Sequence, residues 1–132
     1  MTVPVHRAGT RALLVDLPDL ATAMAWHAAL SSSPLPGQTS VGAAARTVLV
    51  RFASTSAADA ARNVLPEFLP GDATSTEPRN ITVDVIYDGE DLEDLAAHLG
   101  MTVDALVDWH TTTVWTAAFG GFAPGFTYCV PE

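Results

Sequence analysis

The sequence of 132 residues has no lysine, a single cysteine and few charged residues of any kind. All six basic residues are arginines, and 15 acidic residues bring the formal net charge to −9. A lone Cys129 cannot form a disulfide within the chain, which agrees with a reducing compartment, and its apolar neighbours predict a buried, inert thiol. No apolar run approaches the roughly 20 residues that a membrane-spanning helix needs.

The charges are divided unevenly along the chain. Residues 1–79 carry all six arginines and six acids, whereas residues 80–132 carry nine acids and neither lysine nor arginine. Such an acidic surface argues against binding to nucleic acid or anionic lipid, since both require cationic patches. The N-terminus lacks the basic and apolar stretches of a secretory signal, so the expected location is the cytoplasm.

Hydrophobic patterns predict an α+β order in the first part of the chain. An N-cap at Asp16 or Asp19 starts a helix that extends to about Ser31. Ser56, with Asp59 three residues later, starts a second helix in capping-box fashion, which Pro66 ends or kinks. The buried stripe of the first helix is expected at Leu20, Met24, His27 and Leu30. Strands are predicted over residues 11–16, 39–45, 47–53 and 81–87.

The resulting order, βαββαβ, is typical of a ferredoxin-like sandwich in which helices cover one face of an antiparallel sheet. Two short helices are predicted to follow, over residues 90–99 and 102–110, with Gly100 ending the first and Thr102 capping the second. A further strand is expected over residues 114–119. It leads into a glycine-rich and aromatic run at 120–128.

Clustered carboxylates follow the predicted strand that ends at Tyr87. Asp88, Glu90 and Asp91 offer oxygen ligands for Mg²⁺ beside a nucleotide phosphate, or one of them a general base. In the structural alternative, Asp88 caps a helix, and the partial positive charge at the helix N-terminus stabilises the other two acids.

His110, at the end of the second short helix, is a candidate for proton transfer near neutral pH. Its position at a helix C-terminus is also explained by the helix dipole alone, and the same holds for His98. The four histidines show no zinc-binding spacing, so we expect no structural metal.

The run from Gly120 to Tyr128 contains a turn signal and evenly spaced aromatic residues. Pro124 and Gly125 suit the two central positions of a type II turn. Free N–H groups of such a turn can hold a carboxylate or phosphate, while aromatic rings shape a small pocket. A hairpin with a purely structural aromatic core is the equal alternative.

In this order, the motifs at 87–92 (Tyr-Asp-Gly-Glu-Asp-Leu), 110–111 (His-Thr) and 121–128 (Gly-Phe-Ala-Pro-Gly-Phe-Thr-Tyr) resemble the KipI / 5-oxoprolinase B-subunit family, also called allophanate hydrolase subunit 1. The resemblance implies a ferredoxin-like domain at 1–87, followed at 88–132 by a helical connector and the start of a cyclophilin-like β-barrel. Most of that barrel is missing from the chain, so we expect either a fragment or the ordered part of a longer product. The isolated chain is expected to be inactive.

The resemblance also implies an activity and an assembly. Members work with a homologous partner of the allophanate hydrolase subunit 2 type, which is the C component of 5-oxoprolinase, and with a separate A component. Together they open 5-oxoproline to glutamate with ATP, or act on related small amides such as allophanate.

The resemblance implies ATP and Mg²⁺ as cofactors. We hypothesise that His110 and Asp88 are catalytic residues and that Asp88, Glu90 and Asp91 are Mg²⁺ ligands. Substrate or nucleotide would contact a set in the glycine-rich run: Gly121, Phe122, Pro124, Gly125, Phe126 and Tyr128.

Phosphoryl transfer needs cations, and residues 80–132 have no lysine or arginine, so we expect a partner subunit to supply them. The competing interpretation is a regulatory protein, because family members named KipI inhibit a sensor histidine kinase.

Overall fold

The computed structural model describes residues 2–71 and 79–131. These residues form two compact units: one comprises residues up to 71 together with Ala117–Tyr128, and the other residues 79–116 with 129–131. Each unit is described by itself below. For comparisons along the sequence, the first region means residues 2–71 and the second region residues 79–131.

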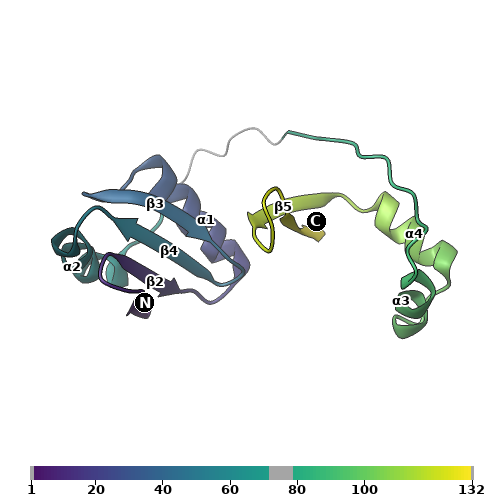
Figure 1. Cartoon of the computed structure of the whole chain (residues 1–132), viewed down its shortest axis with the longest axis horizontal. Helices are drawn as coiled ribbons and strands as arrows, with labels where there is room; N and C mark the ends of the chain where they lie inside the picture. Colours follow the sequence, from purple (N-terminus) through teal and green to yellow (C-terminus); the bar gives the residue numbers. More distant parts are fainter. Residues whose placement is uncertain (1, 72–78, 132) are drawn as a thin grey trace. The chain divides into compact units, whose positions relative to one another are not determined.

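A four-stranded antiparallel sheet forms the centre of the first region (Figure 1). Its strand order is β1-β2-β4-β3, and cross-strand partners such as Leu13 with Val50, and Val15 with Val48, set the register. The alternation of apolar residues along β2 and β4 therefore turns one set of side chains to the same face. The strands are β1 Val5–Arg7, β2 Ala12–Asp16, β3 Gln38–Ala43 and β4 Thr47–Phe52.

Two helices, α1 (Leu20–Ser32) and α2 (Thr55–Val64), pack against that face of the sheet. The short 3₁₀ helix Leu65–Glu67 follows α2, so Pro66 does end the α-helix. Buried residues of α1 and α2 join those of β2 and β4 in one core cluster. The cluster consists of Leu13, Val15, Leu17, Ala23, Trp26, Leu30, Val48, Val50, Phe52, Ala58, Ala61 and Leu65. Complete burial of each large member contributes about 1.5–3 kcal/mol.

The buried stripe of α1 differs from the predicted one. Ala23, Trp26 and Leu30 are buried, whereas Met24 and His27 are only half-buried. The prediction followed the aliphatic residues and missed that Trp26 packs edge-on against Phe68, with ring centroids 4.9 Å apart.

The N-cap of α1 is Asp19, one of the two predicted positions. Its carboxylate accepts a hydrogen bond from the Thr22 N–H at 2.8 Å, and this bond lowers the pKa of Asp19. The predicted start of α2 at Ser56 is wrong, because Ser54 is the N-cap and accepts from the Ala57 N–H at 3.1 Å. A serine two residues earlier thus takes the capping role.

Gly37 lies directly before β3, at a position where no side chain fits. Its φ is +75°, and its carbonyl accepts a hydrogen bond from the Ala53 N–H at 2.8 Å. A Cβ added there would lie 2.7 Å from the Cβ of Ala57. Both the backbone angle and the contact with α2 therefore require glycine.

The predicted strand at 81–87 is wrong. Residues 79–89 contain neither helix nor strand and run as an extended segment (Figure 1). The edge beside β2 is instead taken by β1, a strand that the sequence patterns did not predict. His6 of β1 bonds Asp16 at 3.1 Å, and Arg7 pairs with Asp59 of α2. The alternating pattern at 81–87 therefore has no sheet partner among the described residues.

The second region contains two short helices and a hairpin, close to the predicted bounds. The helices are α3 (Leu92–His98) and α4 (Val103–Thr112), and Thr102 caps α4 by accepting from the Ala105 N–H at 3.2 Å. The strands β5 (Trp115–Gly120) and β6 (Thr127–Pro131) pair in a two-stranded sheet.

A mixed α+β chain with antiparallel sheets is thus confirmed. The ferredoxin-like and cyclophilin-like arrangements, and the domain boundary after residue 87, stay predictions. Cys129 is exposed, so the expectation of a buried thiol is wrong. In the described part of the chain, no helix is long and apolar enough to cross a membrane.

Candidate active site

His110 lies in the last turn of α4 and is surrounded by aromatic side chains. Its Nδ1 is 2.5 Å from the hydroxyl of Tyr87, and the two rings meet edge to face with centroids 5.8 Å apart. The Trp115 indole N–H donates to the His110 carbonyl at 2.9 Å, and their rings lie 5.1 Å apart. Trp109 packs on Trp115 at 5.3 Å. The His110 side chain is exposed, but Tyr87 and Trp115 contact its ring.

The contact between Tyr87 and His110 was not predicted from the sequence. The two residues are 23 positions apart, and the predicted strand would have placed Tyr87 in a sheet. A signal was present nonetheless, since Trp109 and Trp115 flank His110 closely in the sequence. A histidine among tryptophans suggests ring packing, which a search for metal or catalytic spacing does not detect.

Asp88, Glu90 and Asp91 lie in the exposed segment between Tyr87 and α3. The predicted capping by Asp88 is wrong, because the N-cap of α3 is Asp91, and its side chain makes no capping hydrogen bond. Within the described ranges, no three His, Cys, Asp or Glu side chains are grouped to hold a metal ion. The three carboxylates do not make a Mg²⁺ site by themselves, so their metal role stays a prediction that requires further ligands.

The run at 121–126 forms the connection of the hairpin. The Phe126 N–H donates to the Ala123 carbonyl at 3.0 Å, and Gly125 has φ +79° at the second central position, as a type II turn requires. The predicted turn at Pro124 and Gly125 is confirmed. The Gly121 N–H also donates to the Phe126 carbonyl at 3.2 Å, so part of the turn's hydrogen-bonding capacity is used internally.

The aromatic rings of the hairpin pack on one another. Phe119 stacks on Tyr128 with centroids 4.8 Å apart, and Phe126 contacts both Tyr128 and Phe122 edge-on. A Cβ at Gly121 would come within 3.0 Å of the Tyr128 ring.

Phe122 is the unusual residue of this turn. It has φ +60°, a region that bulky side chains seldom adopt, and it is 90% exposed. Such strain is frequent where a backbone is shaped for a ligand. Sequence patterns gave no sign of this conformation.

The predicted site residues fall into two sets in different units. Asp88, Glu90, Asp91 and His110 belong to one unit, and the turn residues together with Tyr128 belong to the other. The functional role of each set stays a prediction. Their combination into one site is a prediction.

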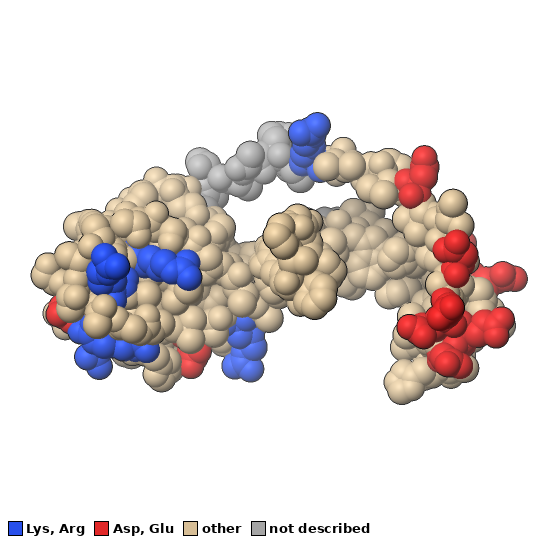
Figure 2. Space-filling view, viewed as in Figure 1, with Lys and Arg blue, Asp and Glu red and all other residues tan. Residues whose placement is uncertain are grey.

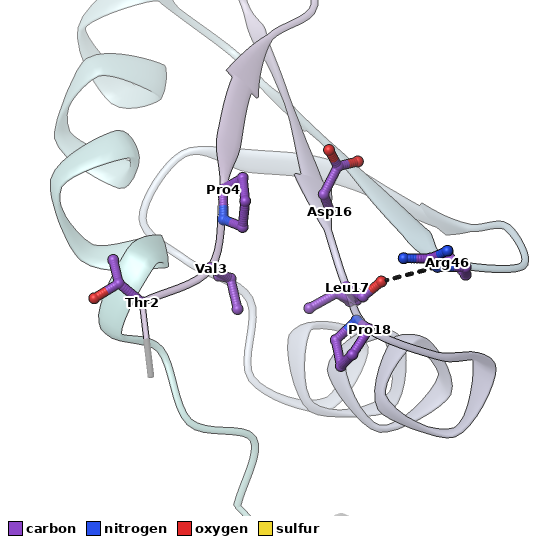
Figure 3. A pocket seen from close by; sticks show the side chains of 7 residues that line it. All are labelled: Thr2, Val3, Pro4, Asp16, Leu17, Pro18 and Arg46. Atoms are coloured by element: carbon purple, nitrogen blue, oxygen red, sulfur yellow. Dashed lines mark hydrogen bonds between the residues drawn. The ribbon is translucent and has the colours of Figure 1, made fainter.

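A surface cavity of about 590 Å³ lies at one end of the four-stranded sheet, where β1 begins, β2 ends and β4 begins (Figure 3). The Arg46 side chain closes one side by donating from Nε to the Leu17 carbonyl at 3.3 Å. The cavity is lined by Thr2, Val3, Pro4, Asp16, Leu17, Pro18 and Arg46. None of the predicted site residues is among them.

The charges separate as the sequence predicts. Figure 2 shows most basic side chains over the first region, whereas acidic side chains gather around α3 and α4. Arg79 is the one basic residue of the second region. Residues 80–132 have no lysine or arginine to neutralise a phosphate. Residues 80–131 therefore do not fit an ATP site by themselves, and binding of ATP needs groups from another chain or segment.

Comparison with known proteins gives the family. Residues 3–132 match the family described as carboxyltransferase domain, subdomain C and D, and the chain belongs to this family. The B subunit of 5-oxoprolinase from Escherichia coli O157:H7 is 30% identical over 118 residues, which cover 87% of this chain and 47% of that relative. The resemblance to the KipI / 5-oxoprolinase B-subunit family is confirmed. The chain spans about half the length of the curated relative it matches.

Proposed function

We propose that this chain is a subunit of a heteromeric, ATP-dependent small-amide hydrolase, with 5-oxoproline opened to glutamate as the first candidate reaction. The observation that carries the proposal is the family match, which includes every predicted site residue. The similarity to a relative named as the B subunit of 5-oxoprolinase supports the choice of substrate. An allophanate-type amide is the second candidate within the same chemistry.

In this proposal, His110 and Asp88 act on the amide through proton transfer or hydrogen bonding. Their exposure leaves both accessible to a substrate, and the aromatic contacts of His110 hold its ring in place. The turn with Phe122, Gly125 and Phe126 contacts the substrate or nucleotide. When bound, ATP would activate the amide oxygen, but the cations that such a step needs must come from outside residues 80–132.

A partner subunit is the expected source of those cations. Besides its acidic character, the second region exposes many large apolar side chains, such as Ile81, Ile86 and Phe122. Exposed apolar groups surrounded by polar residues are typical of interaction surfaces. We propose that this partner is a homologous protein of the allophanate hydrolase subunit 2 type, the C component of 5-oxoprolinase, with a separate A component completing the enzyme.

The test is turnover by a purified complex of this chain and its candidate partners. ATP hydrolysis that depends on 5-oxoproline is expected. His110→Ala and Asp88→Ala should each lower kcat by about 100-fold or more, the usual contribution of a proton-transferring group. His98→Ala and Asp104→Ala are matched controls on exposed positions of α3 and α4 and should retain activity.

Two results would contradict these roles. Full activity of His110→Ala or Asp88→Ala in an intact complex would remove that residue from the mechanism. Kinase inhibition without amide turnover would favour the regulatory interpretation, which we place second because the matched relative is named as an enzyme subunit.

A further inference from the structure

The hydrogen bond between Tyr87 and His110 occupies one of the two imidazole nitrogens. The phenol oxygen lies 2.5 Å from Nδ1, so this nitrogen is not available to a substrate. Trp115 donates to the backbone carbonyl of His110 and not to its ring. Any contact of the ring with a substrate must therefore be made by Nε2.

The direction of this hydrogen bond follows from the acidity of the two groups. A phenol O–H is a much stronger acid than the N–H of a neutral imidazole, and an imidazole nitrogen accepts better than a phenol oxygen. The short bond is therefore O–H to Nδ1, with Tyr87 as the donor. A neutral imidazole has one donor and one acceptor nitrogen, so its proton must then be on Nε2.

The surroundings keep this arrangement fixed. The Trp115 bond anchors the backbone of His110, and the Trp115 ring lies against the imidazole with centroids 5.1 Å apart. Tyr87 approaches with its ring nearly perpendicular, at 81°. Rotation of the imidazole would break the bond to Tyr87 and disturb its ring contacts.

We infer that Tyr87 is a positioning residue that holds His110 with its proton on Nε2, so that His110 serves as a hydrogen-bond donor to the amide. This inference rests on the proposed function. A neutral histidine in this form can donate to an oxygen that gains negative charge, as preorganised donors do in other enzymes. Asp88 then acts as the base. Proton transfer and hydrogen bonding, which the proposed function left open for both residues, are thus assigned to one residue each.

The first experiment reads the tautomer directly and requires no activity. Imidazole ¹⁵N shifts of the labelled full chain are recorded at mildly alkaline pH, with His110→Gln identifying the signals. We expect the His110 shifts of a proton held on Nε2. In Tyr87→Phe, which keeps the ring but loses the hydroxyl, they should move toward the averaged values of exposed His98. A proton on Nδ1 in the wild type, or unchanged shifts in Tyr87→Phe, would overturn the inference.

The second experiment uses the assembled complex. Tyr87→Phe should lower kcat about tenfold, the effect of one hydrogen bond, with little change in KM. An unchanged kcat would overturn the link between Tyr87 and catalysis. If the wild-type complex does not turn over 5-oxoproline or allophanate, the proposed function fails together with the donor role of His110, whereas the ¹⁵N shifts still decide whether Tyr87 sets the tautomer.

Discussion

The two regions of this chain use their apolar residues in opposite ways. Thirteen of the fifteen buried apolar side chains lie in the first region, and the second region buries only Ala96 and Leu106 among its described residues. Conversely, eleven of the thirteen exposed large hydrophobic side chains belong to the second region. The first region buries most of its large apolar side chains in one core, whereas most of those in the second region are exposed.

Hydrogen exchange should show the largest difference between the regions. Backbone amides of Val48 and Val50, in the centre of the sheet, are expected to exchange mainly through global unfolding. Amides of residues 81–87 lack partners in the described structure and should exchange near the intrinsic rate. Mass spectrometry of the chain alone measures both. Strong protection at 81–87 without a partner would contradict the comparison.

Truncation of a core residue should affect stability much more than the same kind of change in the second region. Leu13 is fully buried, so Leu13→Ala should lower the free energy of unfolding by about 2–5 kcal/mol. Val83 is 72% exposed, and Val83→Ala should change it by less than about 0.5 kcal/mol. Chemical denaturation followed by far-ultraviolet circular dichroism compares the two variants. Equal effects would show that both regions fold as one cooperative unit.

Charge reversal should slow association with a partner subunit when the changed residue lies in the second region, but not when it lies in the first. Glu93→Lys and Asp94→Lys add cations to the acidic surface of α3 and should slow association about tenfold at low salt. The effect should shrink as salt rises, because exposed charges are screened. Glu67→Lys in the first region is the matched control. Binding kinetics measured across a salt series would contradict the prediction if all three variants behaved alike.

The smallest expected effect concerns the N-cap of α1. The hydrogen bond from Thr22 lowers the pKa of Asp19 below 3.8, so its contribution is complete above the unfolded pKa and is lost as pH falls through the folded pKa. Asp19→Asn keeps a capping oxygen and should remove this acid dependence, whereas Asp19→Ala removes the cap at every pH. Unfolding measured from neutral pH to below pH 3.8 tests both variants. An unchanged slope in Asp19→Asn would disprove the linkage.

Local signals predicted the elements well where neighbouring residues decide the structure. The caps at Asp19 and Thr102, the end of α2 before Pro66 and the turn at Pro124 all depend on a few adjacent residues. The strand at 81–87 failed because a strand also needs an edge to pair with. Val5–Arg7 already pairs with the edge of β2. This strand is too short for a periodic pattern to predict it.

The candidate site shows the same limit. Spacing identified Asp88, His110 and the turn residues, because each belongs to a recognisable local motif. The hydrogen bond between Tyr87 and His110 joins residues that are distant in the sequence. The positive φ of Phe122 depends on the three-dimensional shape of its turn. Neither can be read from local spacing. Sequence reasoning therefore proposed candidate groups but did not find the contact between Tyr87 and His110.

Gly37 gives a practical rule for comparing sequences with this one. The Ala57 contact and the positive φ act together, so a relative with any other residue at this position must have changed both the loop before β3 and the start of α2. The rule fixes the alignment at one point that owes nothing to the active-site motifs. It can thus separate sequences that share the whole N-terminal scaffold from those that share only the motifs at 87–128.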